Sequence, residues 1–270
     1  MLARRVVCLN QGAYIDFSYV AHERHRELRE LLTASPPPSK VGGEGVTTVS
    51  QRAKDLLRFL DSSLKSVALQ NFRLLIDHHF KGRSEVAPRI CIKGNWSSGA
   101  GEQNIVAPII RDDGSSGDFT TSLADDNTGF RQVIKQGCFY SNQDIARAAL
   151  LRTYRNPRLN SPQLDALRAR LDLATVEAGQ GFTADDWLRC WTDWKEGDDP
   201  RKCYRSTLII PMTLRNNNLS EEFRGRLSKR VPQFDMSRYD RSILGFLCFD
   251  HPQAGFFNDV DDVALGYMVA

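Results

Sequence analysis

Eight polar and aromatic residues stand where predicted strands meet loops, which is where ligand-binding groups concentrate in folded domains. Lys93 and Arg205 would supply positive charge for an anionic group, and Trp96 or Tyr140 could stack on a ring. Each side chain could equally belong to the rim of the core, and Asp250 could equally cap the turn that follows it. The candidate ligand-binding set is Lys93, Asn95, Trp96, Tyr140, Asn142, Tyr204, Arg205 and Asp250.

Signatures of nucleophilic catalysis are missing from the sequence. It contains no G-x-S-x-G elbow and no Gly-rich phosphate loop of the P-loop type. Cys138, in "KQGCFYSNQD", follows a glycine near a possible helix N-terminus, where a thiolate could be stabilised. A small buried residue on a short strand is the simpler interpretation of Cys138. We therefore assign no catalytic residue.

Cysteine and histidine spacing predicts no metal site. The six cysteines include no C-x-x-C pair, which is typical of reduced, mostly buried thiols in a cytoplasmic protein. The close histidine pairs, in "HERH" and "DHHF", have no cysteine at zinc-ligand spacing. Acidic pairs such as Asp125–Asp126 and Asp185–Asp186 stand at loop ends and helix starts, which favours helix capping over metal binding. The sequence identifies no cofactor.

The elements that would position these residues are an antiparallel sheet and several helices. The strongest strand signals are "CYRSTLIIPMTLRNN", with Pro211 at or near an edge, and "SILGFLCFD". Shorter strands are predicted in "VAPRICIKGNW" and after "EQN". Helices are predicted in "QLDALRARLDLA", after Thr183 as N-cap, after Asn142 as N-cap, and from Asn258 or Asp259. This order predicts an α+β domain with helices on one face of the sheet.

A long helix is predicted before this domain. Residues 18–33 also have helical spacing, and the break "ASPPPSKVGGEG" separates the two helices. Apolar residues of the second helix follow steps of three and four, with one polar asparagine, as in the seam of paired helices. The predicted dimerisation seam is Leu57, Leu60, Leu64, Val67, Asn71 and Leu74. We predict three parts: residues 1–45, 46–83 and 84–270.

Composition argues against two classes of partner. The formal net charge is +3 and the sequence pI is about 8.5, which is too near neutral to indicate a nucleic-acid binder. No apolar run approaches the roughly 20 residues that span a bilayer, and the N-terminus lacks a signal-peptide core. We therefore expect a cytoplasmic protein that binds neither nucleic acid nor membrane.

The last third of the sequence resembles the end of a GAF domain. That family closes with a strand ending in proline, then an "xxGxLxxD" strand, then an "xxFxxxDxxxLxxxxA" helix. The matching residues are Pro211, Gly245, Leu247, Asp250, Phe257, Asp261, Leu265 and Ala270. The stretch "FRQVIKQGCFYSNQD" is similar to the central GAF element, and the resemblance extends over roughly residues 86–270.

The resemblance implies a PAS-like, six-stranded antiparallel sheet with helices behind it and a long helix before it. GAF domains mostly bind a small molecule between the sheet and its covering loops, and they pass the signal to an output domain through helices. We therefore expect a regulatory sensing module that binds a small molecule of unknown identity. It would form a homodimer through its helices, with the output domain elsewhere.

Two alternatives remain open at the level of sequence. Some GAF-fold proteins reduce free methionine sulfoxide with cysteines, and Cys91 and Cys138 are the plausible pair for that chemistry here. The domain could also have lost its ligand and serve as a dimerisation scaffold. A closed core without a cavity would favour the scaffold, whereas a cavity lined by polar groups would favour the sensor.

Overall fold

The computed structural model describes residues 69–97, 103–111, 121–192, 194–195, 202–215 and 241–270. The chain divides into two compact units, Met1–Lys81 and Gly82–Ala270. In the first unit the described helix is α3 (Leu69–His79), in which Arg73 and Asp77 form an ion pair at 2.8 Å. The predicted helix at 18–33 and the seam residues Leu57, Leu60, Leu64 and Val67 lie outside the described residues. Asn71 and Leu74 belong to α3, where Leu74 is 60% exposed.

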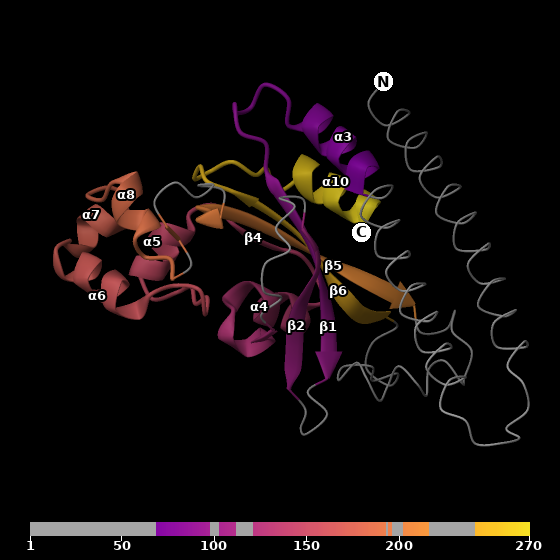
Figure 1. The fold of residues 1–270 in the computed structure, drawn as a ribbon, viewed down its shortest axis with the longest axis horizontal. Coiled ribbons are helices and arrows are strands. Elements are labelled where there is room, and N and C mark those ends of the chain that lie inside the picture. Colours follow the sequence, from indigo (N-terminus) through magenta and orange to yellow (C-terminus); the bar gives the residue numbers. More distant parts are fainter. Residues whose placement is uncertain (1–68, 98–102, 112–120, 193, 196–201, 216–240) are drawn as a thin grey trace, which may run out of the picture. The chain divides into compact units, whose positions relative to one another are not determined.

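The second unit is built on an antiparallel sheet of six strands in the order β3-β2-β1-β6-β5-β4 (Figure 1). Helices accompany the sheet, so the predicted α+β class is confirmed. The two strongest sequence signals became β5 and β6, two long neighbouring strands in the interior of the sheet. The strands are β1 (Arg89–Ser97), β2 (Asn104–Arg111), β3 (Ser122–Leu123), β4 (Tyr140–Asn142), β5 (Ser206–Arg215) and β6 (Arg241–His251).

Strand β5 shows how proline is accommodated inside the sheet. Pro211 pairs with Phe246 of β6, while pairing with β4 on the other side ends at Ile209. A proline has no N–H to donate, so it belongs where one neighbouring strand is missing. The prediction that Pro211 lies near an edge therefore agrees with the local pairing.

The sequence signals predict the helices of the second unit but not all of their bounds. The helix predicted in "QLDALRARLDLA" ends at Ala169, and the closing helix begins at Asp261 rather than at Asn258 or Asp259. Thr183 caps α8 and forms a capping box with Asp186, as the sequence predicts. The cap of α5 is Asp144 rather than Asn142, whose side chain instead accepts the backbone N–H of Asp144. The helices are the short η2 (Ala124–Asp126), α4 (Thr128–Gln136), α5 (Ile145–Leu150), α6 (Ser161–Ala169), α7 (Leu173–Glu177), α8 (Ala184–Leu188) and α10 (Asp261–Val269).

Helices pack on both faces of the sheet, which corrects the expectation of helices on one face. Adjacent residues of a strand point to opposite faces. A Cβ atom at Gly129 of α4 would lie 2.6 Å from Ile209, whereas one at Gly266 of α10 would lie 2.5 Å from Ile210. Each helix therefore needs glycine to approach its own face of β5.

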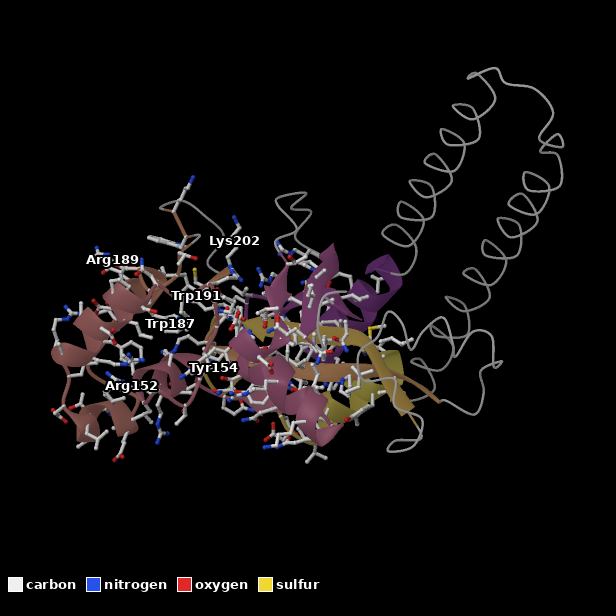
Figure 2. The ribbon with its side chains drawn as sticks, turned by 90° about the horizontal axis from the view of Figure 1, so that it is seen from below. Arg152, Tyr154, Trp187, Arg189, Trp191 and Lys202 are labelled. Carbon is white, nitrogen blue, oxygen red and sulfur yellow. The ribbon has the colours of Figure 1, made fainter. Side chains whose placement is uncertain are left out.

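Helices α6, α7 and α8 gather at one side of the unit, beyond the sheet (Figure 1). Their shared core contains Trp187 and Trp191, whose rings meet edge-on with centroids 5.6 Å apart. Trp187 also donates its indole N–H to the carbonyl of Tyr204, at 3.3 Å. Figure 2 shows both tryptophans between these helices and the strands, with the exposed Arg189 and Arg152 on either side of them. Among the described residues, no helix is long and apolar enough to cross a membrane.

Candidate functional site

A cavity of about 400 Å³ lies against the α4-covered face of the sheet, and we call it the sheet cavity. Strands β1 and β2 form its floor, and its walls come from the start of α4, from residues 156–158 and from Tyr204. Its size is within the range of small-molecule sites. The basic and polar residues that line it include Arg89, Lys93, Arg111, Asn127, Asn156, Arg158 and Tyr204.

The lining of the sheet cavity is strongly basic. Four arginine or lysine side chains line it, and none of the described lining residues is acidic. Arg89 is compensated from behind, because its guanidinium lies 3.0 Å from the carboxylate of Asp250 and both side chains are buried. Burial lowers the pKa of Arg89, but the charge and hydrogen bond of Asp250 outweigh burial and leave that pKa raised.

Strand β1 places two of the cations by its two-residue alternation. Arg89, Cys91 and Lys93 share one face of the strand and line the cavity together. Arg111, at the end of β2, stands opposite Cys91 in the register. Burial raises the pKa of the Cys91 thiol, while the positive charges of Lys93, Arg89 and Arg111 act against that shift. These cations therefore surround Cys91.

Asp250 anchors the floor of the cavity to the middle of the sheet. Its second carboxylate oxygen accepts a hydrogen bond of 2.8 Å from the hydroxyl of Thr207 on β5. The register places Asp250 between Arg89 of β1 and Thr207 of β5, on the same row of the sheet. Three neighbouring strands thus fix the position of the Arg89 guanidinium.

A buried hydrogen-bond network forms one wall of the cavity. The amide of Asn156 donates to the hydroxyls of Tyr204, at 2.9 Å, and Tyr154, at 3.3 Å. Burial raises the pKa of both tyrosines, and their mutual interaction adds to this effect for Tyr204. Both hydroxyls therefore remain protonated at neutral pH, and the network presents neutral polar groups to the cavity.

Several contacts position Arg158. Its backbone N–H donates to the side-chain oxygen of Asn156 at 3.0 Å, and its guanidinium donates to the carbonyl of Lys202 at 3.2 Å. The guanidinium also lies over the ring of Trp191, 4.9 Å from the centroid. A stacked, anchored arginine is pre-organised to meet a ligand with little loss of side-chain entropy.

The start of α4 contributes a polar and an aromatic side chain. The side-chain oxygen of Asn127 accepts the N–H groups of Gly129 and Phe130 and so caps the helix. The ring of Phe130 lies 4.7 Å from the ammonium group of Lys93 and 4.8 Å from the ring of Phe246. Because the side chain of Asn127 already accepts hydrogen bonds from these N–H groups, an anion in the cavity would bind to the side-chain cations instead.

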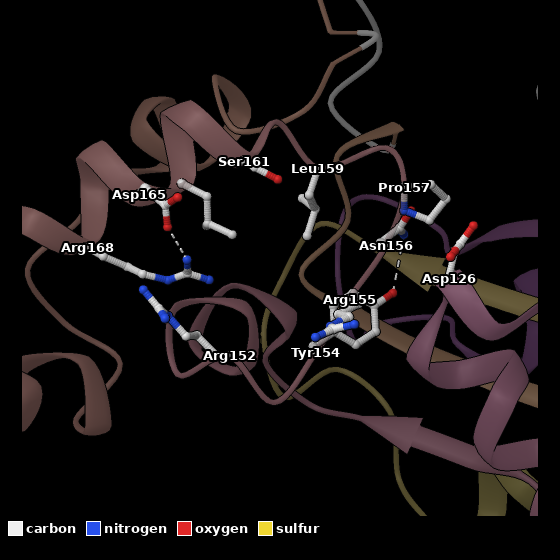
Figure 3. A pocket seen from close by; sticks show the side chains of 11 residues that line it. Asp126, Arg152, Tyr154, Arg155, Asn156, Pro157, Leu159, Ser161, Asp165 and Arg168 are labelled. Atoms are coloured by element: carbon white, nitrogen blue, oxygen red, sulfur yellow. Dashed lines mark hydrogen bonds and ion pairs between the residues drawn. The ribbon is translucent and has the colours of Figure 1, made fainter.

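A second cavity, of about 530 Å³, lies on the other side of residues 156–157 (Figure 3). We call it the helix cavity, and its lining includes Asp126, Arg152, Arg155, Asp165 and Arg168. Arg168 donates to the carbonyls of Ala149 and Leu150 at the end of α5, and it pairs with Asp165. The charges of this cavity are mixed, and its most buried arginine already stabilises the end of a helix.

Two of the eight candidate ligand-binding residues, Lys93 and Tyr204, line the sheet cavity. Asp250 lies directly behind it as the partner of Arg89. Asn95 is buried on β1 and donates to the carbonyl of Ile243, so its amide ties β1 to β6. The side chain of Trp96 is not among those described.

The other three candidates lie away from the sheet cavity. The hydroxyl of Tyr140 accepts a hydrogen bond from Asn142, and the Tyr140 ring packs near Gly129 in the core. Arg205 forms an ion pair of 2.7 Å with Asp144 and stacks on Phe182. Arg205 and Tyr204 are neighbours in the chain but contact different parts of the fold, so a single anion would not meet both.

Sequence reasoning missed four residues of the site. Arg89 could have been found, because "RICIK" alternates and places Arg89 on the same face as Lys93. Arg111 ends a strand, which is also a recognisable position. Asn156 and Arg158 carry no such signal, because they reach the cavity through contacts with Tyr204 and Lys202, which are far away in the sequence.

Cysteine and metal chemistry find little support in the described part of the chain. No group of three or more metal-ligating side chains occurs there. Cys91 is buried, whereas Cys138 is exposed beside β4, and strands β6 and β5 lie between β1 and β4. At about 4.8 Å between neighbouring strands, the two thiols are too far apart for a disulfide.

Comparisons with protein-family models, curated proteins and solved structures find no match for this chain.

Proposed function

We propose that residues 84–270 form a GAF-like regulatory domain that binds a small anionic molecule in the sheet cavity. The observation that carries the proposal is the convergence of Arg89, Lys93, Arg111 and Arg158 on one cavity whose described lining contains no acidic side chain. Like charges held together in a partly enclosed space are costly to a fold, and a bound anion relieves that cost. The cavity also favours a ligand-binding domain over a closed scaffold.

The position of the cavity supports the GAF-like part of the proposal. A ligand there would contact the sheet, the start of α4 and residues 156–158 at once. It would therefore link the central sheet to the helices that follow residue 158. Binding that draws these segments together is a physical route from an occupied cavity to a change at the helices.

Dimerisation through the long helix is the second half of the proposal. Leu74 exposes 60% of its surface on α3, as an unpartnered seam residue would. Light scattering of the full chain at several concentrations tests this part separately from ligand binding. A wild-type dimer that becomes monomeric in Leu64→Asp supports the seam, and a wild-type monomer at all concentrations contradicts it.

Thermal unfolding of the full chain with and without small anions tests ligand binding. Citrate, pyrophosphate and AMP are suitable probes because they differ in shape and carry several charges. We expect at least one of them to raise the unfolding temperature of the wild type but not of Lys93→Gln. Lys135→Gln is the matched control, because Lys135 is an exposed lysine at the other end of α4. No stabilisation by any anion would exclude the proposed function.

A further inference from the structure

We infer that the ligand of the sheet cavity is a phosphorylated small molecule that carries at least two negative charges. The inference rests on the proposed function and narrows it to one ligand class. Its basis is the number of cations, the directions from which they approach, and the size and apolar wall of the cavity.

The cations of the cavity require more than a single negative charge. Within the described part of the chain, neither Lys93 nor Arg111 forms an ion pair, and Arg158 adds a third positive charge beside them. Arg89 is already compensated by Asp250. A ligand with one charge, such as a monocarboxylate, would leave either Lys93 or Arg111 without a counter-charge. A phosphate monoester or diphosphate supplies two or three charges in one compact group.

The directions of approach favour a tetrahedral group over a planar one. Lys93 comes from β1, Arg111 from the end of β2, and Arg158 from the loop before α6. A carboxylate is best matched by one arginine fork in its own plane. A phosphoryl group instead presents three oxygens that point apart and can meet cations from three segments. The placement of these three side chains therefore fits a phosphoryl group.

The remaining space implies that the phosphoryl group is attached to an organic molecule. About 400 Å³ is far more than a free phosphate ion fills. Val106, Pro108, Phe130 and Pro157 give part of the lining an apolar character. Apolar walls beside a cluster of cations are suited to a ligand with a charged end and a less polar body. A sugar phosphate or a mononucleotide has these properties.

Isothermal titration of the full chain, purified in a phosphate-free buffer, tests the inference. The probes are ribose 5-phosphate, AMP and pyrophosphate, with citrate as a carboxylate of comparable charge and ribose as a neutral analogue. We expect one of the phosphorylated probes to bind at least about 10-fold more tightly than citrate, and ribose not to bind. Lys93→Gln and Arg111→Gln should each weaken that probe about 10-fold to 100-fold, the range for one charge-assisted hydrogen bond.

Control variants keep the result independent of folding. Lys93→Arg preserves the charge and should retain binding within about 10-fold, while Lys135→Gln should bind as the wild type does. Citrate binding as tightly as every phosphorylated probe, and losing affinity in Lys93→Gln, would overturn the inference but leave an anion-binding function in place. If no probe binds, including citrate, the proposed function fails together with the inference.

Discussion

The sheet cavity and the helix cavity share Asn156 and Pro157, and arginine lines both, but the surroundings of the arginines differ. In the helix cavity Arg168 is bonded to the carbonyls of Ala149 and Leu150 and to Asp165. In the sheet cavity Lys93 and Arg111 line the space without an ion pair in the described part of the chain. In the helix cavity a cation therefore satisfies the carbonyls at the end of α5, whereas in the sheet cavity Lys93 and Arg111 can bind a ligand.

This difference separates structural cations from cations kept for binding. A cation that satisfies backbone carbonyls contributes to stability, because its removal leaves buried acceptors without a donor. A cation held among other cations contributes little or costs stability, and sites of this kind are retained for function. Substitutions of Lys93 or Arg111 should therefore change anion binding more than stability, whereas substitutions of Arg168 should change stability more than anion binding.

The largest expected effect is at the floor of the sheet cavity. Asp250→Asn leaves the buried guanidinium of Arg89 without its counter-charge, and breaking a buried pair costs about 3–5 kcal/mol of unfolding free energy. Asp165→Asn is the matched control at the helix cavity, because the side chain of Asp165 is 60% exposed. Exposed pairs contribute about 1 kcal/mol or less. Urea unfolding of both variants measures the contrast, and equal losses would contradict it.

Arg168→Met should lower the unfolding free energy by about 1.5–3 kcal/mol, because two carbonyls at the end of α5 lose a charged donor. Anion binding at the sheet cavity should be unchanged. Arg155→Met serves as the control, since Arg155 lines the same cavity but is exposed, and its change should stay within about 0.5 kcal/mol. Chemical denaturation and anion titration of the same samples give both readouts. A loss of anion binding in Arg168→Met would show that the two cavities are not separable.

Asn156→Ala should affect both stability and binding, because Asn156 lines both cavities. Its amide donates to two tyrosine hydroxyls and its oxygen accepts the N–H of Arg158, so the loss should be about 1–3 kcal/mol. Asn142→Ala removes a similar set of contacts, to the Tyr140 hydroxyl and the Asp144 N–H. Both variants should be destabilised, but only Asn156→Ala should weaken anion binding, as titration would measure.

The sheet itself was within reach of sequence reasoning. Runs such as "STLIIP" and "SILGFLCFD" predict strands because apolar and β-branched side chains dominate them, and these runs became β5 and β6. The same reasoning predicted helices on one face, because it could not assign the closing helix to the face of Ile210. Which face a helix covers depends on tertiary packing rather than on local pattern.

The candidate site was predicted in part for a related reason. Tyr204 stands beside the start of β5, a strand–loop junction that can be recognised from local sequence, whereas Lys93, expected at such a junction, lies in the middle of β1. Arg205 stands at the same junction but turns to Asp144, 61 residues away in the chain. Asn156 and Arg158 belong to a connection whose path is set by contacts with Tyr204, Trp191 and Lys202. Long-range contacts of this kind leave no trace in a single sequence.

The smallest expected effect is the most direct test of the contrast between the cavities. Lys93→Met removes a positive charge beside Arg89 and Arg111 and loses the contact of the ammonium group with Phe130. Relief of repulsion offsets the lost cation–π contact, so the unfolding free energy should change by less than about 1 kcal/mol.

A small change in unfolding free energy would also be expected if Lys93 were a surface lysine without strong interactions. The response of Lys93→Met to salt distinguishes that case from repulsion offset by the cation–π contact. Because 0.5 M NaCl screens like charges, it should stabilise the wild type more than Lys93→Met in the absence of a bound anion. Lys135→Met, at an exposed position on α4, should keep the salt response of the wild type. Thermal unfolding at low and high salt measures all three proteins. An unaltered salt response in Lys93→Met would mean that the cations of the sheet cavity do not repel one another, and the reason for expecting an anion there would be lost.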